Sequence, residues 1–266
     1  MNVFVRSFRL QKAGNVFEEC EDWAYPKILS GGGGEDKLLS MSSLSFAVAD
    51  GANEGMFSGE WAKILVKSYC RSMGKGAEPF DFLKNAFKAW EFWIKDYLNK
   101  RKRRNRPIKW FEEPGLEAGA FSTLLGVTLT DSGEPDVKRW RAFAAGDCCL
   151  FQVRNNALVH KFPVEGSEGF GNRPFLIHSK SVLNEKLLEA CKTAEKDCLV
   201  GDVFYMMTDA LACWFLKECE DNNLPWVALS NFTTGIDVFQ KWVECLRDKK
   251  SMKNDDVTLV CIEVMA

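Results

Sequence analysis

The sequence predicts an α+β fold in which sheets and helices form separate layers. Two helical patterns come early in the chain, strand-like runs dominate its middle, and helices return before a last strand. Because that order is not a regular β-α alternation, a doubly wound parallel sheet is disfavoured. The 266 residues, 46% of them hydrophobic, can fill one sizeable core. We therefore expect a single domain over residues 1–266.

Hydrophobic spacing justifies the first elements. The run LSFAVA at 44–49 predicts a strand that ends in the sharp turn Asp50-Gly51. Apolar residues at helical spacing then predict a helix over 58–72 and a longer one over 80–100.

Strands dominate the next part of the chain. β patterns on both sides of the turn-forming pair Gly146-Asp147 predict strands over 139–145 and 148–154. The same criteria predict further strands over 121–130, 203–208 and 257–264, and helices over 210–220 and 238–247.

Composition excludes several classes of protein. Lys and Arg number 35 and Asp and Glu number 37, so the formal net charge is −2. A near-neutral chain argues against a dedicated nucleic-acid binder, whose affinity depends on neutralising many phosphates. No apolar run approaches the roughly 18 residues of a membrane helix, and the first residues lack a signal-peptide pattern. We expect a cytoplasmic protein with no membrane partner.

Cysteine and histidine patterns disfavour zinc and covalent catalysis. The ten cysteines contain no C-x-x-C pair, and the chain has two histidines, His160 and His178. Zinc sites and nucleophilic triads both need more of these residues at closer spacing. We expect buried, reduced thiols. The glycine run at 31–34 lacks the Lys-Ser/Thr of a phosphate-binding loop, so we expect a surface turn there.

The run KRKRRNR at Lys100–Arg106 is the strongest local charge feature. It follows the long amphipathic helix, where basic side chains complement the carbonyl end of the helix dipole. A solvated helix end is the favoured interpretation. A docking patch for an acidic or nucleic-acid partner is the alternative.

Acidic residues recur where predicted strands meet loops. Asp50 ends one strand, Asp209 ends another, Asp255 precedes the last strand, and the pair Glu21-Asp22 precedes an apolar segment. Any one of them could simply cap a helix or begin a turn, as Asp209 could before the helix over 210–220. If several converged, their charges would repel unless a divalent cation neutralised them.

Several sequence blocks resemble those of the metal-dependent protein phosphatases of the 2C type. FAVADGANEGMFSGEWA at 46–62 is similar to the family's strand that ends in Asp-Gly before a turn and a helix. GFGNRPFLIHS at 169–179 resembles a segment of the compact bacterial branch. The remaining blocks occur in the family's order and are CEDW at 20–23, GAFSTLLGVTL at 119–129, AFAAGDCCLFQV at 142–153, GDVFYMMTDALACWFL at 201–216 and NDDVTLVCIEV at 254–264.

This resemblance implies a four-layer α-β-β-α sandwich with two central antiparallel sheets. It also implies a centre of two Mn²⁺ or Mg²⁺ ions at one edge of the sheets, with Asp50, Asp209 and Asp255 as the catalytic residues. The implied ligands are Asp50 between the ions, the Gly51 carbonyl, Asp209 and Asp255 on the second ion, Glu21 through a water, Asp22 in support, and Asp147 beside Asp209 at a third, weaker ion.

The implied activity is hydrolysis of phosphoserine and phosphothreonine in proteins, a signalling reaction. Two ions held by carboxylates would activate a water molecule that attacks phosphorus in line. Oxygen ligands suit magnesium and manganese, and no covalent phosphoenzyme is required. The implied partner is a phosphorylated protein, and we expect a monomer.

The chain departs from the family at three places. Ala52-Asn53-Glu54 follow the Asp-Gly pair, and Asp256 stands where the family has asparagine. Phe17 stands where many members have an arginine that grips the phosphate, and Lys12 and Arg6 are candidate replacements. The alternative hypothesis is therefore a catalytically weak or inactive phosphatase-fold module that binds a partner. A third hypothesis makes Lys100–Arg106 a nucleic-acid contact.

Overall fold

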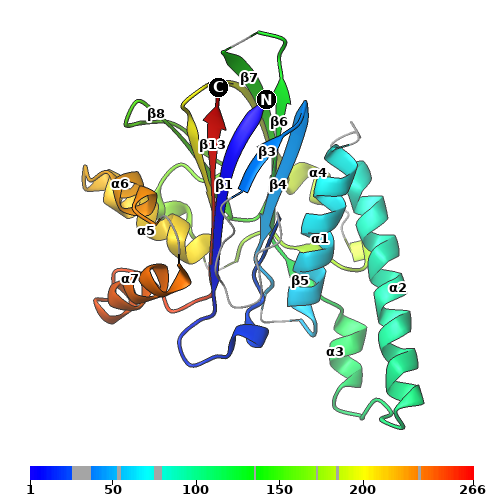
Figure 1. Ribbon diagram of the computed structural model, residues 1–266. Helices are drawn as coiled ribbons and strands as arrows, with labels where there is room; N and C mark the ends of the chain where they lie inside the picture. Colours follow the sequence, from blue (N-terminus) through cyan, green and yellow to red (C-terminus); the bar gives the residue numbers. More distant parts are fainter. Residues whose placement is uncertain are drawn as a thin grey trace.

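A computed structural model describes residues 1–25, 37–52, 55–74, 80–134, 136–171, 173–183, 186–232 and 235–266. The glycine run at 31–34 lies outside these residues. Two large antiparallel sheets face each other, and helices cover both outer faces (Figure 1). This arrangement confirms the predicted four-layer α-β-β-α sandwich. No helix in the described ranges is both long and apolar enough to cross a membrane.

In the first sheet, the first and the last strand of the chain lie side by side. Its strand order is β3 (Lys37–Ser40), β1 (Asn2–Leu10), β13 (Val257–Met265), β12 (Val203–Met207), β8 (Cys149–Arg154) and β9 (Ala157–Phe162). The second sheet has the order β11 (Lys192–Leu199), β7 (Val137–Ala145), β6 (Leu124–Asp131), β4 (Ser43–Ala49) and β2 (Trp23–Tyr25). A short pair, β5 (Phe121–Ser122) and β10 (Ile177–His178), lies beside them.

Helices form the outer layers. Helices α1 (Ser58–Met73) and α2 (Asp81–Arg103) cover the second sheet, and α5 (Asp209–Glu220), α6 (Pro225–Ser230) and α7 (Ile236–Asp248) cover the first (Figure 1). The shorter helices are α3 (Glu113–Ala118), α4 (Leu187–Ala190) and the 3₁₀ turns η1 (Phe17–Glu19), η2 (Ser167–Gly169) and η3 (Ser181–Leu183).

The alternation of side chains along the central strands explains the layers. In β13, Val260 and Ile262 face the core between the sheets, whereas Leu259 faces the core under α5 and α7. Both faces of this strand are buried over most of its length, so its sequence is apolar except at Thr258 and Glu263. In β4, Phe46 faces the inter-sheet core and Ala47 faces α1.

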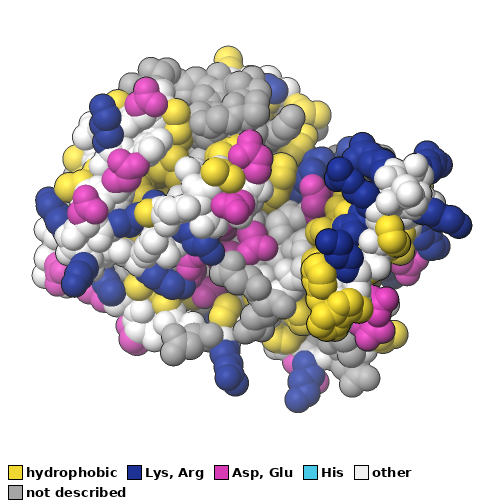
Figure 2. Space-filling view, turned by 90° about the horizontal axis from the view of Figure 1, so that it is seen from below, with side chains coloured by type: hydrophobic (Ala, Val, Ile, Leu, Met, Phe, Trp, Pro, Cys, Tyr) yellow, Lys and Arg dark blue, Asp and Glu magenta, His cyan; other side chains and the backbone are white. Residues whose placement is uncertain are grey.

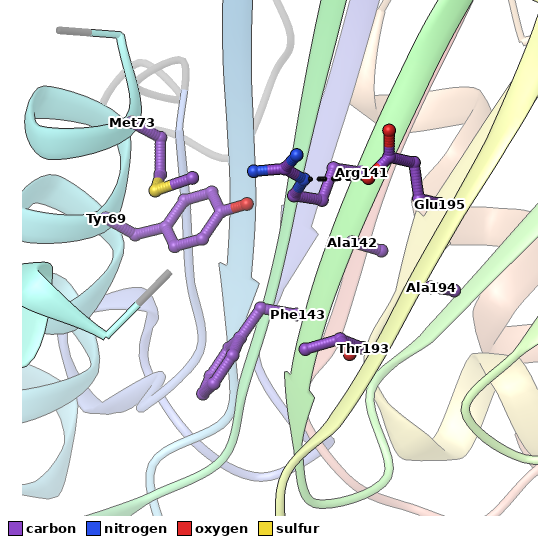
Figure 3. A pocket seen from close by; sticks show the side chains of 8 residues that line it. All are labelled: Tyr69, Met73, Arg141, Ala142, Phe143, Thr193, Ala194 and Glu195. Atoms are coloured by element: carbon purple, nitrogen blue, oxygen red, sulfur yellow. Dashed lines mark hydrogen bonds and ion pairs between the residues drawn. The ribbon is translucent and has the colours of Figure 1, made fainter. Parts of the chain in front are cut away.

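Helix α1 lies very close to the second sheet at Tyr69. The Tyr69 ring covers Gly126, where any side chain would overlap it, and the Tyr69 hydroxyl lies 3.3 Å from the Thr128 hydroxyl. A cavity of about 200 Å³ lies beside this contact, with Arg141 paired to Glu195 across it at 3.2 Å (Figure 3). Tyr69 and Arg141 are already paired with Thr128 and Glu195, so we interpret this cavity as a gap in packing and not as a binding site.

All the predicted helices and strands are present, with shifted ends. The run 121–130 is divided at Thr123 into β5 and β6, and α2 continues to Arg103, so most of the basic run forms its last turn. Strands at the edges, such as β11, were not predicted because their sequences are polar and exposed. All ten cysteines are free, and Cys245 is exposed, contrary to the expectation of buried thiols.

Candidate active site

Four of the predicted acidic residues line one cavity of about 600 Å³ at an edge of the sandwich. Strand pairing brings their segments together, since β4, β7 and β12 end at this edge and β13 begins there. The cavity is lined by the side chains or backbone of Asp50, Gly51, Asp147, Asp209 and Asp255, together with Thr123, Arg173, Lys253 and others.

The Asp50-Gly51 turn is fixed by its backbone. The Asp50 amide donates to Thr123 Oγ1 at 3.0 Å, and the Asp50 carbonyl accepts from Ser122 Oγ at 2.8 Å. A side chain at Gly51 would lie 2.7 Å from the Ser58 carbonyl carbon, so glycine is required where α1 begins. These contacts use the backbone of Asp50, so the oxygens of its carboxylate are left for other contacts.

Asp147 is held in the tight turn between β7 and β8. Gly146 has φ of +100°, and a side chain there would meet Thr123 at 2.5 Å. Asp147 is only 8% exposed. Burial, and then the charge of Asp209, raise the pKa of Asp147 to about 7.

A lysine joins the two remaining cavity carboxylates. Lys253 Nζ lies 2.6 Å from Asp255 Oδ2 and 3.7 Å from Asp209 Oδ2. Asp209 is the first residue of α5, whose N-cap is Thr208, so the predicted N-cap role belongs to its neighbour. Burial and Asp255 raise the pKa of Asp209.

Glu21 and Asp22 lie outside the lining of the cavity. Asp22 is fully buried, and its Oδ2 accepts from Thr208 Oγ1 at 2.9 Å, while its Oδ1 has no hydrogen-bond partner. Burial, and then Asp256, raise the pKa of Glu21 to about 7. Among charged groups, Asp22 contributes most to raising the pKa of Asp50, after burial itself, so the two lie close enough to interact.

The structure explains two of the unusual residues. Asp256 accepts the backbone amides of Lys12 and Glu21 at 2.8 and 2.7 Å, so its carboxylate ties the segment after β1 to the start of β13. The Arg9 guanidinium lies 4.3 Å from the centre of the Phe17 ring.

Neither Arg6 nor Arg9 of β1 lines the carboxylate cavity. Arg9 also donates to the Asp22 carbonyl at 2.9 Å and is 8% exposed. Arg6 donates to the Phe232 carbonyl at 3.0 Å and lines a different cavity with Tyr205. Arg6 is therefore not the replacement for the missing phosphate-binding arginine.

The donor chemistry and electrostatics of the cavity suit a divalent cation. Hard carboxylate oxygens are what Mg²⁺ and Mn²⁺ bind. Raised pKa values and the unpartnered Asp22 oxygen indicate uncompensated negative charge. In this structure the cavity carboxylates are not close enough together to form an ion site. Within the described ranges, no three His, Cys, Asp or Glu side chains form a group that could hold an ion.

Comparison with known proteins identifies the fold. No family model matches the chain, and no curated protein matches its sequence. Solved structures do match. The Mycobacterium tuberculosis serine/threonine phosphatase PstP/Ppp aligns over 100% of both chains with a TM-score of 0.59 and 16% identity. The chain thus has a fold similar to that of serine/threonine phosphatases, and the resemblance is confirmed for the fold.

Two further structures agree. The photosystem II phosphatase PBCP aligns over 99% of both chains with a TM-score of 0.59 and 14% identity. The catalytic domain of PstP in complex with two manganese ions covers 99% of this chain and 100% of its own, with a TM-score of 0.54 and 15% identity.

Two cations of the cavity were missed by sequence reasoning, Arg173 and Lys253. Arg173 is exposed and lines the cavity from a segment with no regular secondary structure. Lys253 lies two residues before Asp255, in a polar stretch. Arg173 belongs to the block 169–179 that resembles the family, and its place in that block could have identified it as a candidate site residue.

Proposed function

We propose that the chain is a single-domain Mn²⁺- or Mg²⁺-dependent phosphatase of phosphoserine and phosphothreonine in proteins. The observation that carries this proposal is the cavity lined by Asp50, Asp147, Asp209 and Asp255 in a phosphatase 2C-type fold. Mutual repulsion among buried carboxylates is relieved by bound cations, which gives the cavity an affinity for divalent metal.

The proposed ligands are the seven residues named from the sequence. Two ions would be held by Asp50, the Gly51 carbonyl, Asp209 and Asp255, and a third by Asp147. Glu21 would contact the first ion through a water molecule, and Asp22 would support the ligands of that ion. When bound, such ions supply an activated water molecule and positive charge toward the phosphoryl group.

Arg173 is the proposed anchor for the phosphate. It lines the cavity, and no carboxylate in the described part of the chain pairs with it. A guanidinium can bind two phosphoryl oxygens at once. Lys253 is committed to Asp209 and Asp255, so it must release at least one of them when a cation binds there.

The test is phosphate release from a phosphothreonine peptide. We expect turnover with Mn²⁺, none with excess EDTA, and none from Asp50→Asn or Asp209→Asn proteins that remain folded by circular dichroism. Asp248→Asn is the matched control, because Asp248 is exposed at the end of α7. Full activity in excess EDTA would refute the proposal.

A second candidate function is a phosphatase-fold module that binds a partner without turnover. Phe17 at the arginine position and the Lys253 ion pairs favour it. Such a module would still bind the phosphopeptide, whereas manganese-supported turnover lost in Asp50→Asn would eliminate it.

A further inference from the structure

The end of α2 and the segment that follows it form a basic projection, which we call the α2–α3 lobe (Lys100–Phe111). In Figure 2, Lys and Arg side chains gather on the part of the molecule at the right, together with a group of hydrophobic side chains. Figure 1 places α2 and α3 on that side. The exposed cations of the lobe are Lys100, Lys102, Arg103, Arg104, Arg106 and Lys109.

One arginine holds the lobe in shape. Arg101 donates to both carboxylate oxygens of Glu112 at 2.8 Å, to the Arg106 carbonyl at 2.9 Å and to the Pro107 carbonyl at 3.0 Å. The Tyr97 hydroxyl, at 2.9 Å from Arg101, completes this network. A bidentate arginine–carboxylate pair fixes both planes, so the loop after α2 has a defined conformation.

The other cations of the lobe are available for a partner. Lys100 is paired with Asp96 at 2.6 Å, but no carboxylate in the described part of the chain pairs with Lys102, Arg103, Arg104 or Arg106. Four adjacent like charges repel one another, and an anionic partner would relieve that repulsion.

Two aromatic side chains stand beside these cations. Trp110 is 81% exposed and Phe111 is 59% exposed, with ring centres 5.9 Å apart. Lys109 Nζ lies 5.4 Å from the centre of the Phe111 ring. Exposed tryptophan next to arginine is the composition found at the centres of protein interfaces rather than on ordinary solvated surface.

The lobe is connected to the segment that holds Asp50 through α3 and β5. The Ala118 carbonyl, at the end of α3, lies 2.8 Å from His178 Nε2, and Lys180 donates to the Glu117 carbonyl. The chain then enters β5, where Ser122 donates to the Asp50 carbonyl at 2.8 Å. Figure 2 shows Asp and Glu side chains on the same face as the lobe.

We propose that the α2–α3 lobe docks an acidic segment of the phosphorylated protein, next to the residue that enters the cavity. This inference rests on the proposed function. Acidic residues flanking the phosphoresidue are attracted by the lobe while the phosphoresidue enters the cavity, so the two contacts together fix the direction in which the segment lies. A nucleic acid fits less well, because the whole chain carries a net charge of −2.

The test compares two phosphothreonine peptides of equal length, one flanked by glutamates and one by alanines and serines. The lobe variant carries Lys102→Gln, Arg103→Gln, Arg104→Gln and Arg106→Gln. The control variant carries Lys196→Gln, Lys241→Gln, Lys249→Gln and Lys250→Gln, four exposed lysines elsewhere. Para-nitrophenyl phosphate, which is too small to reach the lobe, reports the cavity alone.

In the lobe variant we expect kcat/KM for the acidic peptide to fall roughly tenfold, mainly through KM, and the wild-type preference to weaken with salt. Turnover of the neutral peptide and of para-nitrophenyl phosphate should not change. Arg103→Glu with Arg104→Glu changes the charge of the lobe by the same four units and should give a similar loss. Equal losses for both peptides, or the same loss in the control variant, would overturn the proposal.

Binding separates this proposal from the proposed activity. Fluorescence anisotropy of the labelled acidic peptide on Asp50→Asn protein should still depend on the lobe, even if the wild type hydrolyses nothing. Lobe-dependent binding of single-stranded RNA or of anionic vesicles, without preference for the acidic peptide, would overturn the docking proposal while leaving phosphatase activity intact.

Discussion

Replacing Asp50 by asparagine should stabilise the metal-free protein while destroying its response to metal. No described hydrogen bond uses the Asp50 carboxylate, since its contacts to Ser122 and Thr123 are made by backbone atoms. Burial and the charges of Asp22, Asp209, Asp255 and Asp147 raise its pKa. Asparagine therefore removes a repelled charge and breaks no described contact.

The size of the effect follows from electrostatics. Each unit by which the pKa is raised costs the ionised protein about 1.4 kcal/mol at neutral pH, and a buried polar group without a partner costs about 1–3 kcal/mol, more when it is charged. In a domain of this size about 1 kcal/mol shifts Tm by roughly 2–4 °C. Asp50→Asn should thus melt several degrees above wild type in EDTA at pH 7.5.

Manganese should offset that difference in stability. A cation at a hundred times its Kd stabilises the folded state by about 2.7 kcal/mol, and this gain should appear in the wild type and in Asp248→Asn but not in Asp50→Asn. Differential scanning calorimetry in EDTA and in Mn²⁺ gives the Tm of the wild type and of both variants. An Asp50→Asn protein that melts below wild type in EDTA, or that gains equally from Mn²⁺, would refute the reasoning.

Three further predictions concern the cavity. Lys253→Met should tighten Mn²⁺ binding by roughly three- to tenfold in calorimetric titration, because two partly exposed ion pairs worth about 0.2–1 kcal/mol each no longer compete; weaker binding would contradict the competition. The raised pKa values of Glu21 and Asp147, about 7 in the folded state, mean that these groups bind protons more tightly when folded. The unfolding free energy of the metal-free protein should therefore fall as pH rises from about 4 to 7, and Mn²⁺ affinity should rise through pH 7; a flat titration of both would count against it. Arg173→Gln should raise KM for phosphopeptide at least tenfold with unchanged Mn²⁺ affinity, and an unchanged KM would remove it as the phosphate anchor.

Most buried strands of the fold could be predicted from the sequence, with the interior strand β1 as an exception, and the edge strands could not. Strands such as β4 and β13 are apolar because both faces are covered, so their pattern is strong. β11 carries exposed polar residues and is a strand because it pairs with β7, which is a property of another segment. Long-range pairing of this kind has no local signal.

Some residues of the candidate site could likewise be found from local sequence, whereas their pairings could not. Asp50 and Asp147 lie beside glycines that tight turns require, so their positions could be found in the sequence. That Lys253 pairs with Asp209 depends on packing between α5 and the segment before β13. The function of Asp256 as an acceptor for two amides likewise depends on the segment after β1, far away in the chain.

The most direct test of a carboxylate cavity that gathers divalent ions is a crystal of the protein grown with Mn²⁺ and measured for anomalous scattering at the manganese edge. We predict two strong peaks in the cavity, with Asp50 between them, Asp209 and Asp255 on one of them, and Lys253 turned away from at least one aspartate. A map with no peak in the cavity, with Lys253 still joining Asp209 and Asp255, would contradict the prediction.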